Sequence, residues 1–574
     1  MEFDLMNYGF DSWERVPVAR ASLDEDDEIY ECLKLQEKKG IELGKENEKD
    51  KGRICVVGCT PRDKHGRQML SAPHSTYSSV ASLEAVKVCW ANAAVRESGA
   101  LQEEGGFPPQ KTDFTNFYLG SECPRKGKVW LDLRALVPLM SETERQLHVS
   151  VENPVYLCVK AIYGLDDSGR AAILDLRERI KKGLGLTQTT ACASLYRDDH
   201  DDGSVSFLVA YSDDTNRSGS QVNRAKLVSV MGVHYGVKVE PADQMIGFRH
   251  AGRSFDPPFV LYKMAHVGHL SKVISDYEVA NKVIVPVSDR AITLDVMRES
   301  FEGIVCYDIP AASHTAVAAL MWRYRCDRDE LGYPLSSLSS FVSPGKWNDI
   351  LEEQLRSCLG YCKGTLYDGL IFRVHPKCVW ENLKHVVYVD ASLQFPRSQG
   401  GYVHILTDSW GSILPIAWRS WKQPLACVAV KDCEYVACHT AVDDQLNWVK
   451  STGVRDHTLY VLCDNRGVVD DLAGDGEGEG YLARALGLRK ANLKEMIQVG
   501  QLRVGWVRSE SNLSDEKTKL DKARFGFHRP LSSLGVSDSE AIQLRFDLSS
   551  YMAAFEVAGA AGLVDVRACC AFGD

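Results

Sequence analysis

Carboxylates at the ends of apolar stretches are the residues of this sequence that most directly suggest chemistry. Asp213 and Asp214 follow the apolar run 207–210 and precede a polar turn at 215–220. A hairpin here would carry both carboxylates at its tip, where their repulsion favours a bound divalent cation. Asp113, far upstream, lies in another β-like stretch, and carboxylates from separate strands can hold two metal ions that activate a hydroxyl and stabilise a leaving pyrophosphate. The alternative is a solvent-exposed acidic turn.

A second set of acids stands at the boundaries of expected elements nearer the C-terminus. Asp390 and Asp464 each end a strand-like apolar run, Glu434 stands where a helix is expected to begin, and Asp515 follows a polar turn. Singly these positions are common, because Asp and Glu make up 78 of the 574 residues. The alternative for Glu434 and Asp515 is capping of helix N-termini, where acids are favoured.

The pattern around these acids predicts mixed α and β structure. Apolar periodicity predicts strands at 53–57, 128–133, 205–211, 386–389, 402–406, 414–418 and 459–463, and helices at 79–96, 171–184, 311–321 and 347–362. Helices are expected to dominate after about residue 260. The stretch 24–50 alternates acids and lysines with few large apolar residues, which predicts a solvated helix or a flexible lead-in.

Length and composition limit the classes of protein. The chain is too long for one core, since single cores stop growing near about 250 to 300 residues, and three or four units are expected. It lacks an uninterrupted apolar stretch of about 18 residues and a secretory signal, so neither a membrane partner nor export is expected. Its 18 cysteines include no Cys-x-x-Cys pair, which favours reduced, buried thiols over disulfides or a zinc site.

The net charge of −11 still admits a nucleic-acid partner, because the charge is unevenly distributed. Residues 1–50 hold fifteen acidic and seven basic residues, whereas residues 481–524 hold ten basic and five acidic residues. The chain beyond residue 50 is therefore near charge balance, and its basic segment is suited to phosphate contacts.

The acidic hairpin belongs to a longer pattern that resembles the reverse transcriptase region of copia-type retrotransposon polyproteins. Tyr211-Ser-Asp-Asp214 is similar to the YVDD box, and Val159-Lys-Ala-Ile-Tyr-Gly-Leu165 with Ser168-Gly-Arg170 is similar to the LKKSLYGLKQSGRAW segment. Residues 51–58 are similar to the KARLVARG strand and 113–119 to DVKTAFL. Shorter similarities lie at 318–321, 335–341, 362–365 and 369–372, and residues 328–331 are loosely similar to the family's RPDI element. In all, the resemblance covers about residues 51–527.

This resemblance implies a right-hand polymerase of fingers, palm and thumb. The implied catalytic metal ligands are Asp113, Asp213 and Asp214. Arg53, with Lys51 beside it, would grip the triphosphate of a deoxynucleoside triphosphate, and Tyr118 would exclude the ribose 2′-hydroxyl. The implied cofactor is Mg²⁺, or alternatively Mn²⁺, with two ions per active site, and the implied partners are an RNA template and a DNA primer. For Arg53, Lys51 and Tyr118 the structural alternative is a surface charge or a core aromatic.

The second acidic set resembles the ribonuclease H domain of the same family. Cys433-Glu-Tyr435 is similar to its EAEY helix, Cys463-Asp-Asn465 to CDNQSAI, and residues 512–519 to NPADLLTK. The resemblance implies an α/β nuclease in which four carboxylates around two Mg²⁺ activate water against the RNA strand of an RNA–DNA hybrid. These ligands are Asp390, Glu434, Asp464 and Asp515. The basic segment 481–524 would then contact hybrid phosphates.

The sequence departs from the family pattern beside the expected nucleotide site. Asp166 and Asp167 stand where the family has lysine and glutamine, and Ala172 stands where it has tryptophan. Carboxylates near a triphosphate would repel it. Asp167-Ser-Gly169 also has the residue types of an aspartic protease motif, but it leads into an expected helix instead of following an apolar strand, which disfavours that chemistry.

The resulting hypothesis is an α+β reverse transcriptase with a ribonuclease H domain. Its expected parts are an acidic extension (1–50), fingers and palm (51–250), a helical thumb and linker (251–384), a ribonuclease H domain (385–528) and a tail (529–574). By resemblance the chain would be a processed product or a truncated element. It would act in cytoplasmic virus-like particles or in the nucleus. Its further partner would be the element's integrase or a second copy of the chain. Two alternatives stay open: a degenerate or host-retained remnant that binds nucleic acid or partners without DNA synthesis, and a nuclease-only protein.

Overall fold

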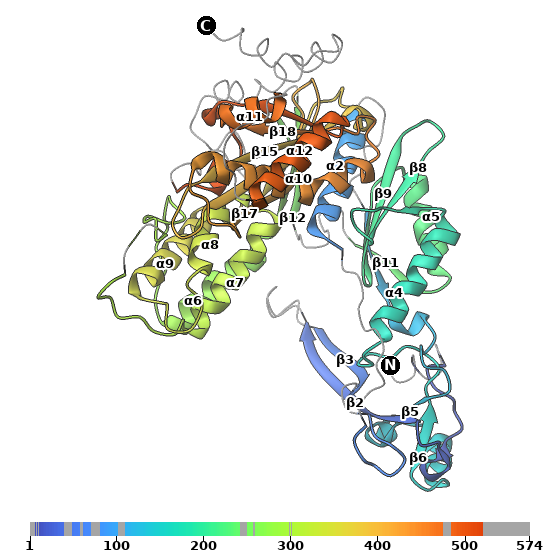
Figure 1. The fold of residues 1–574 in the computed structure, drawn as a ribbon. Helices are drawn as coiled ribbons and strands as arrows, with labels where there is room; N and C mark the ends of the chain where they lie inside the picture. The colour runs from blue at the N-terminus through green and yellow to red at the C-terminus, as the bar shows by residue number, and fades with distance from the viewer. Residues whose placement is uncertain are drawn as a thin grey trace.

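The part of the protein that the structure describes is mixed α and β, as the sequence predicts, and contains three sheets (Figure 1). The computed structural model describes residues 11–39, 49–57, 61–69, 81–100, 110–240, 250–256, 259–297, 301–474 and 484–520, with Met6, Gly9 and Glu299. The expected tail at 529–574 lies outside these residues. Among the helices of the described ranges, none is both long and apolar enough to cross a membrane.

The N-terminal sheet has five strands in the order β1-β6-β5-β2-β3. They are β1 (Val18–Ala19), β2 (Glu28–Lys39), β3 (Lys49–Val56), β5 (Val129–Asp132) and β6 (Pro154–Leu157). The expectation of a helix or a flexible lead-in is wrong for residues 28–39, because they form β2, which pairs with β3 and β5. Tyr30 and Cys32 are buried while the charged Glu31 between them is exposed, and this local alternation is typical of a strand. Residues 40–48 lie outside the described part.

The central sheet has six strands in the order β11-β4-β10-β9-β8-β7. They are β4 (Gln110–Thr115), β7 (Thr187–Gln188), β8 (Leu195–Asp199), β9 (Val205–Tyr211), β10 (Asp214–Arg217) and β11 (Gly236–Val239). Successive residues of β9 point to opposite faces. Leu208 packs in one core cluster with Leu176 of α4 (Ser168–Arg179) and Leu227 of α5 (Gln221–Gly232), whereas Phe207 packs in another with α2 (Leu83–Ala100). Both faces of the sheet are therefore covered.

Helix α2 is buried between the central sheet and the C-terminal half of the chain (Figure 1). The side chain of Asn92 donates to the carbonyl of Val205 at 3.1 Å on the central sheet. The Lys87 ammonium donates to the carbonyl of Arg325 at 2.9 Å and lies 3.3 Å from the centre of a Trp418 ring. A helix that is apolar nearly all round needs burial on all sides, and α2 obtains it by joining the two halves of the molecule.

The C-terminal sheet has eight strands in the order β12-β13-β14-β17-β16-β15-β18-β19. They are β12 (His250–Asp256), β13 (Phe259–Ala265), β14 (Leu370–Val374), β15 (Lys384–Ser392), β16 (Gln399–Thr407), β17 (Ile413–Lys422), β18 (Leu459–Cys463) and β19 (Leu502–Trp506). The sequence indicates the strands at 386–389, 402–406, 414–418 and 459–463. It misses β12, β13 and β14, and for β13 and β14 the reason is that short buried apolar runs do not distinguish a strand from a buried helix.

Two groups of helices cover opposite faces of this sheet (Figure 1). The first group, called the helical unit here, is α6 (Val267–Asn281), α7 (Ala311–Cys326), α8 (Gly332–Ser339) and α9 (Asp349–Gly364). The second is α10 (Val430–Ser451), α11 (Arg466–Ala473) and α12 (Arg484–Gln498). In β15, Val386 and Tyr388 belong to the core cluster of the first group, while Val387 and Val389 belong to that of the second. The predicted helices at 311–321 and 347–362 are present as α7 and α9.

A buried histidine pair lies in the C-terminal sheet. His385 Nδ1 and His404 Nε2 are 2.9 Å apart, and His404 Nδ1 is 2.7 Å from the side-chain oxygen of Gln445. Since that oxygen accepts, His404 carries its proton on Nδ1, and its Nε2 accepts from His385 Nδ1. Burial lowers the pKa of His404 to about 4, and burial together with the charge of His404 holds the pKa of His385 well below its usual value.

We expect this pair to make the fold sensitive to acid. A histidine whose folded-state pKa lies below its unfolded value takes up protons mainly in the unfolded state, so stability falls as pH drops from about 6.5 towards 4. For His404 alone the loss at pH 5 is about 2 kcal/mol. Urea unfolding at pH 7.5 and pH 5 measures it, with His404→Gln as the comparison. Equal losses of stability in the two proteins would contradict the prediction.

Candidate active sites

The turn between β9 and β10 brings the first acidic set together. The two strands pair with Tyr211 opposite Asp214, which leaves Ser212 and Asp213 as a two-residue turn, and Ser212 has a left-handed φ of +52°. Strand β4 lies beside the hairpin with Asp113 directly opposite Asp214. The amide of Phe114 also donates to the carbonyl of Asp213 at 2.7 Å. Because directly opposed residues share a face of the sheet, Asp113 and Asp214 point the same way.

The charges in this set repel one another and are partly neutralised by lysine. Burial raises the pKa of Asp113, and the nearby charge of Asp213 raises it further. Burial also raises the pKa of Asp214, while Lys111, whose ammonium lies 3.1 Å from Asp214 Oδ1, opposes the shift. Asp213 itself is exposed. Among the described residues, these three carboxylates are not found with their oxygens all within 4.8 Å of one another.

Aromatic and basic residues extend this site towards the N-terminal sheet. Tyr118 packs edge-on against Tyr163, with ring centres 4.7 Å apart, and the Arg53 guanidinium lies 5.7 Å from the centre of the Tyr163 ring. Burial raises the pKa of Tyr118, the Asp213 charge raises it further, and Arg53 opposes the shift. Arg53, Tyr118 and Asp213 therefore share one neighbourhood. Lys51 lies in β3, and its side chain lies outside the described part of the chain.

A close backbone contact fixes the Arg53 strand beside this neighbourhood. The amide of Val56 in β3 donates to the carbonyl of Tyr163 at 2.8 Å. Gly164 has φ of +98°, and a Cβ added to it would lie 2.1 Å from the Val56 carbonyl oxygen. Only glycine fits there, since any side chain would push the strand away. Glycine at this position therefore allows the close approach of the two segments.

Arg125 neutralises the two carboxylates at which the sequence departs from the family pattern. It forms ion pairs with Asp166 at 3.2 Å, with Asp167 at 2.9 Å and with Glu28 of β2, and it donates to the Tyr30 hydroxyl at 3.0 Å. The expected repulsion of a triphosphate by Asp166 and Asp167 is therefore reduced. No sequence pattern signals Arg125, because its partners come from distant segments. Asp167 is buried in this ion pair, which also disfavours its use as a protease carboxylate.

Replacing Arg125 is expected to destabilise the N-terminal sheet. In Arg125→Met, the buried carboxylates of Glu28 and Asp167 lose their cation, and breaking a buried pair costs about 3 to 5 kcal/mol. Hydrogen exchange of the backbone amides in residues 28–39 measures the loss of stability in this sheet. Arg134→Met is the matched control, because Arg134 is largely exposed and pairs only with nearby Asp132 among the contacts described. Equal effects of the two substitutions would contradict the prediction.

The second acidic set is gathered at one end of the C-terminal sheet. Strands β15 and β18 are parallel with Val389 opposite Cys463, so Asp390 and Asp464, each one residue further on, leave the pair at the same end. Asp515 begins the short 3₁₀ helix η11 (Asp515–Lys517). Carboxylate oxygens of Asp390, Asp464 and Asp515 all lie within 4.8 Å of one another. This is the spacing that shared cation ligands require.

Glu434 of α10 joins this set through a second group. One oxygen of Glu434 lies within 4.8 Å of ligand atoms of Cys463 and Asp464, and the Cys463 thiol donates to Glu434 Oε2 at 3.7 Å. Burial holds the pKa of Glu434 well above its usual value. Burial also raises the pKa of Asp390 to about 6, although Lys519 opposes the shift. Clustered carboxylates with raised pKa values fit the hard oxygen donors that Mg²⁺ or Mn²⁺ prefer.

Three side chains around this cluster were not assigned a role from the sequence. Lys519 lies 3.4 Å from Asp390 Oδ2 and also pairs with Asp515. The Thr518 hydroxyl donates to Asp390, and the Ser509 hydroxyl donates to Asp464 Oδ2 at 2.6 Å. Lys519 and Thr518 fall within the motif at 512–519, which offered a signal, whereas nothing in the sequence indicates Ser509.

The basic segment 481–524 is less available to an external partner than its composition suggests. Lys490 pairs with Asp471 at 2.7 Å, and Lys517 and Lys519 pair with carboxylates inside the protein. Residues 481–483 and 521–524 lie outside the described part. Phosphate contacts by the remaining basic residues stay a prediction.

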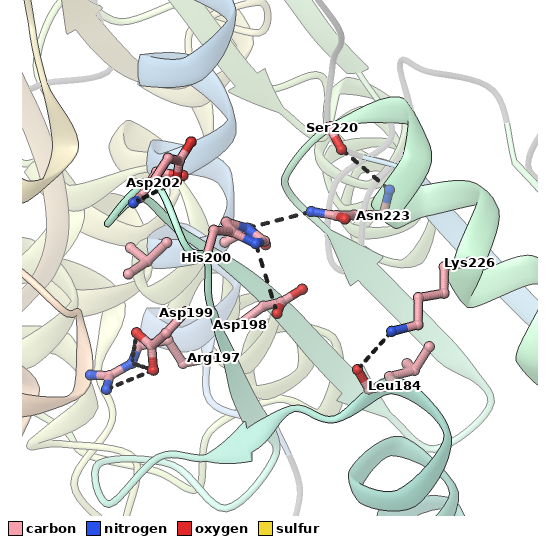
Figure 2. A network of polar contacts seen from close by, with 12 residues as sticks. Leu184, Arg197, Asp198, Asp199, His200, Asp202, Ser220, Asn223 and Lys226 are labelled. Carbon is pink, nitrogen blue, oxygen red and sulfur yellow. Dashed lines mark hydrogen bonds and ion pairs between the residues drawn. The ribbon is translucent and has the colours of Figure 1, made fainter.

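A further polar network at the other end of β9 has the residue types of a nucleophilic triad. His200 Nε2 lies 3.0 Å from the Ser206 hydroxyl, and His200 Nδ1 lies 3.9 Å from Asp198, which also pairs with Arg217 at 2.5 Å. Figure 2 shows His200 between Asp198 and Asn223 of α5. Ser206 is fully buried, and 3.9 Å is too long for a hydrogen bond. The network therefore fastens the β8–β9 hairpin to α5, and its serine is buried out of reach of solvent.

Comparisons with known proteins find matches only among solved structures. No family model matches the chain, and no curated protein matches it either. A foamy viral protease-reverse transcriptase in complex with double-stranded DNA is 10% identical over 80% of this chain and 63% of its own, with a TM-score of 0.39. The foamy viral enzyme in complex with an RNA/DNA hybrid is 11% identical over 80% of this chain and 49% of its own, with a TM-score of 0.40.

A smaller protein matches about a quarter of this chain. LC11-RNase H1 in complex with an RNA/DNA hybrid is 20% identical over 24% of this chain and 99% of its own, with a TM-score of 0.19. The chain thus spans less than two thirds of both viral enzymes. All three TM-scores lie below 0.5, so the functions of these proteins are not carried over to this chain.

Proposed function

We propose that this chain is a copia-type reverse transcriptase with two separate active sites, an RNA-directed DNA polymerase and a ribonuclease H. The observation that carries the proposal is the convergence of Asp390, Asp464 and Asp515, three buried or half-buried carboxylates from distant segments, within 4.8 Å. The partners are an RNA template, a DNA primer, deoxynucleoside triphosphates and the RNA–DNA hybrid that synthesis produces.

In the proposed polymerase site, Asp113, Asp213 and Asp214 would hold Mg²⁺ at the β9–β10 turn. Two such ions lower the pKa of an attacking hydroxyl and neutralise the charge of a leaving pyrophosphate. Arg53 would contact the triphosphate, with Lys51 beside it. Tyr118, held against Tyr163, would limit the space for a ribose 2′-hydroxyl. Lys111 would have to release Asp214 when a cation binds, because both compete for one carboxylate.

In the proposed nuclease site, Asp390, Glu434, Asp464 and Asp515 would hold the ions that activate water against RNA. Ser509 orients the Asp464 carboxylate through its hydrogen bond. Lys519 supplies positive charge between Asp390 and Asp515. Burial and, after it, the charges of neighbouring acids raise the pKa values of Asp390 and Glu434, and bound divalent cations would stabilise the ionised carboxylates.

Two assays on the full chain test the proposal. Primer extension on poly(rA)·oligo(dT) with Mg²⁺ measures synthesis, and cleavage of a hybrid labelled in its RNA strand measures the nuclease. Metal-dependent activity is expected in both assays. A chain that extends no primer and cleaves no hybrid would overturn the proposal and favour the nucleic-acid-binding remnant.

A nuclease-only protein is the second candidate, and one observation favours it. Carboxylate oxygens of Asp390, Asp464 and Asp515 lie within 4.8 Å of one another, whereas among the described residues those of the three polymerase carboxylates do not, and Lys111 pairs with one of the latter. This candidate predicts hybrid cleavage without primer extension, and cleavage that survives Asp113→Asn.

A further inference from the structure

The sequence stretch 328–331 has no role in either proposed site, yet its charged residues are buried. Asp329 begins the short 3₁₀ helix η8 (Asp329–Leu331), between α7 and α8 of the helical unit, and is fully buried. Its carboxylate lies 2.5 Å from the ammonium of Lys517, which is itself fully buried. A buried charge is tolerated when it is paired and hydrogen-bonded, so this contact fixes both residues.

The Lys517 ammonium is fully hydrogen-bonded. Its ammonium donates to the Asp329 carboxylate, to the Asp329 carbonyl at 2.9 Å and to Glu516 Oε1 at 2.6 Å. A lysine ammonium has three donors, and all three are used here. The side chain therefore has one well-defined position, set largely by η8.

Lys517 belongs to η11, the same short helix that begins with Asp515. The Ser420 hydroxyl of β17 donates to the Lys517 carbonyl at 2.6 Å. Gly401 of β16 lies so close that an added Cβ would be 2.6 Å from Lys517 Cβ, so η11 is packed closely against the sheet. Since Asp515 is two residues from Lys517 in one turn, the place of its carboxylate depends on where Lys517 is held.

We propose that Asp329 is a positioning residue of the nuclease site, acting through Lys517 to place the Asp515 carboxylate beside Asp390 and Asp464. The inference rests on the proposed nuclease function and adds that the site is completed by the helical unit. Asp329 touches neither metal nor substrate. The helical unit and the C-terminal sheet are therefore coupled at the catalytic cluster itself.

The neighbouring Glu330 provides a matched control. Glu330 is as deeply buried as Asp329 and pairs with the buried Arg328 at 2.7 Å. Arg328 in turn donates to Thr365, the residue that follows α9. In the contacts described, this pair does not reach η11. Glu330→Gln therefore breaks a comparable buried ion pair in the same turn, one made with Arg328 and not with Lys517.

Hydrogen exchange of the full chain tests the placement without requiring activity. In Asp329→Asn, amide exchange in residues 512–519 is expected to become about 10-fold faster than in the unsubstituted chain. In Glu330→Gln it is expected to stay within about twofold. Unchanged exchange at 512–519 in Asp329→Asn, or equal acceleration in the two variants, would overturn the proposal.

The dependence of hybrid cleavage on Mg²⁺ tests the consequence. Asp329→Asn is expected to raise the Mg²⁺ concentration for half-maximal cleavage about fivefold, with primer extension within about twofold, and Glu330→Gln is expected to change neither. A chain that cleaves no hybrid contradicts the proposed function. In that case the exchange experiment still decides whether Asp329 positions η11.

A triple variant covers the case in which Asp329→Asn does not fold. Asp329→Leu with Lys517→Met and Glu516→Gln removes all three charges of this buried group, and replacing buried ion pairs by uncharged residues is often tolerated. Faster exchange at 512–519 in this folded variant supports the proposal, because the three donated hydrogen bonds are lost. Protection equal to that of the unsubstituted chain would overturn it.

Discussion

Replacing Asp464 by asparagine is expected to reduce cleavage of RNA in an RNA–DNA hybrid by about 10³-fold, or about 4 kcal/mol of transition-state stabilisation. Asp464 belongs to both groups of ligand atoms at the end of the C-terminal sheet, one with Asp390 and Asp515 and one with Glu434 and Cys463. It is the residue through which both groups are joined. Loss of its charge therefore weakens every arrangement of cations in this cluster.

The fold is expected to survive this substitution. Asparagine has the shape of aspartate and retains an oxygen that can accept from the Ser509 hydroxyl. The Trp506 indole donates to the main-chain carbonyl of Asp464 at 3.0 Å, and that bond does not depend on the side chain. Removing one carboxylate from a buried cluster also relieves repulsion, so thermal stability should not fall.

Asp471→Asn separates loss of stability from loss of chemistry. Burial alone would raise the pKa of Asp471, but hydrogen bonds from Lys490, Tyr435 and Lys431 outweigh it and lower the pKa to about 2. Asp471 lies in α11, outside the cluster. Its substitution should reduce stability near neutral pH and leave the rate of cleavage within about twofold. Equal loss of cleavage in Asp464→Asn and Asp471→Asn would contradict the assignment of the nuclease site.

Local pattern was enough to predict the placement of acids at strand ends. Apolar runs ending in Asp390 and Asp464 indicated two strands, and the structure pairs these strands in parallel so that both acids leave at the same end. The hairpin at Asp213 and Asp214 was likewise readable, because a turn between two β-like runs has few alternatives. These features depend on short stretches, which the sequence displays directly.

Pairings between distant segments could not be predicted in the same way. Arg125 meets carboxylates from β2 and from the segment before α4, and Lys517 meets Asp329 across the boundary expected at residue 385. The sequence around a single charged residue does not indicate which distant residue it pairs with. Strand β2 was missed for a related reason, since surface charges conceal the alternate burial of Tyr30 and Cys32.

Replacing Asp213 by asparagine is expected to reduce primer extension by about 10³-fold while leaving hybrid cleavage unchanged. The main-chain carbonyl of Asp213 holds β4 through the amide of Phe114, and this bond is retained in the variant. The side chain is exposed, so the hairpin should keep its structure. What is lost is one of the negative charges that would hold Mg²⁺ next to the primer hydroxyl.

Asp199→Asn is the matched control for this substitution. Asp199 is an exposed acid on β8 of the same sheet, paired with Arg197 beyond the far end of the hairpin (Figure 2). It should extend primers as well as the unsubstituted chain does. If Asp213→Asn and the unsubstituted chain extend primers equally well, any synthesis observed does not depend on this hairpin. If neither extends a primer but both cleave hybrid, the nuclease-only protein is the correct interpretation, because the two sites lie on different sheets and one can be lost without the other.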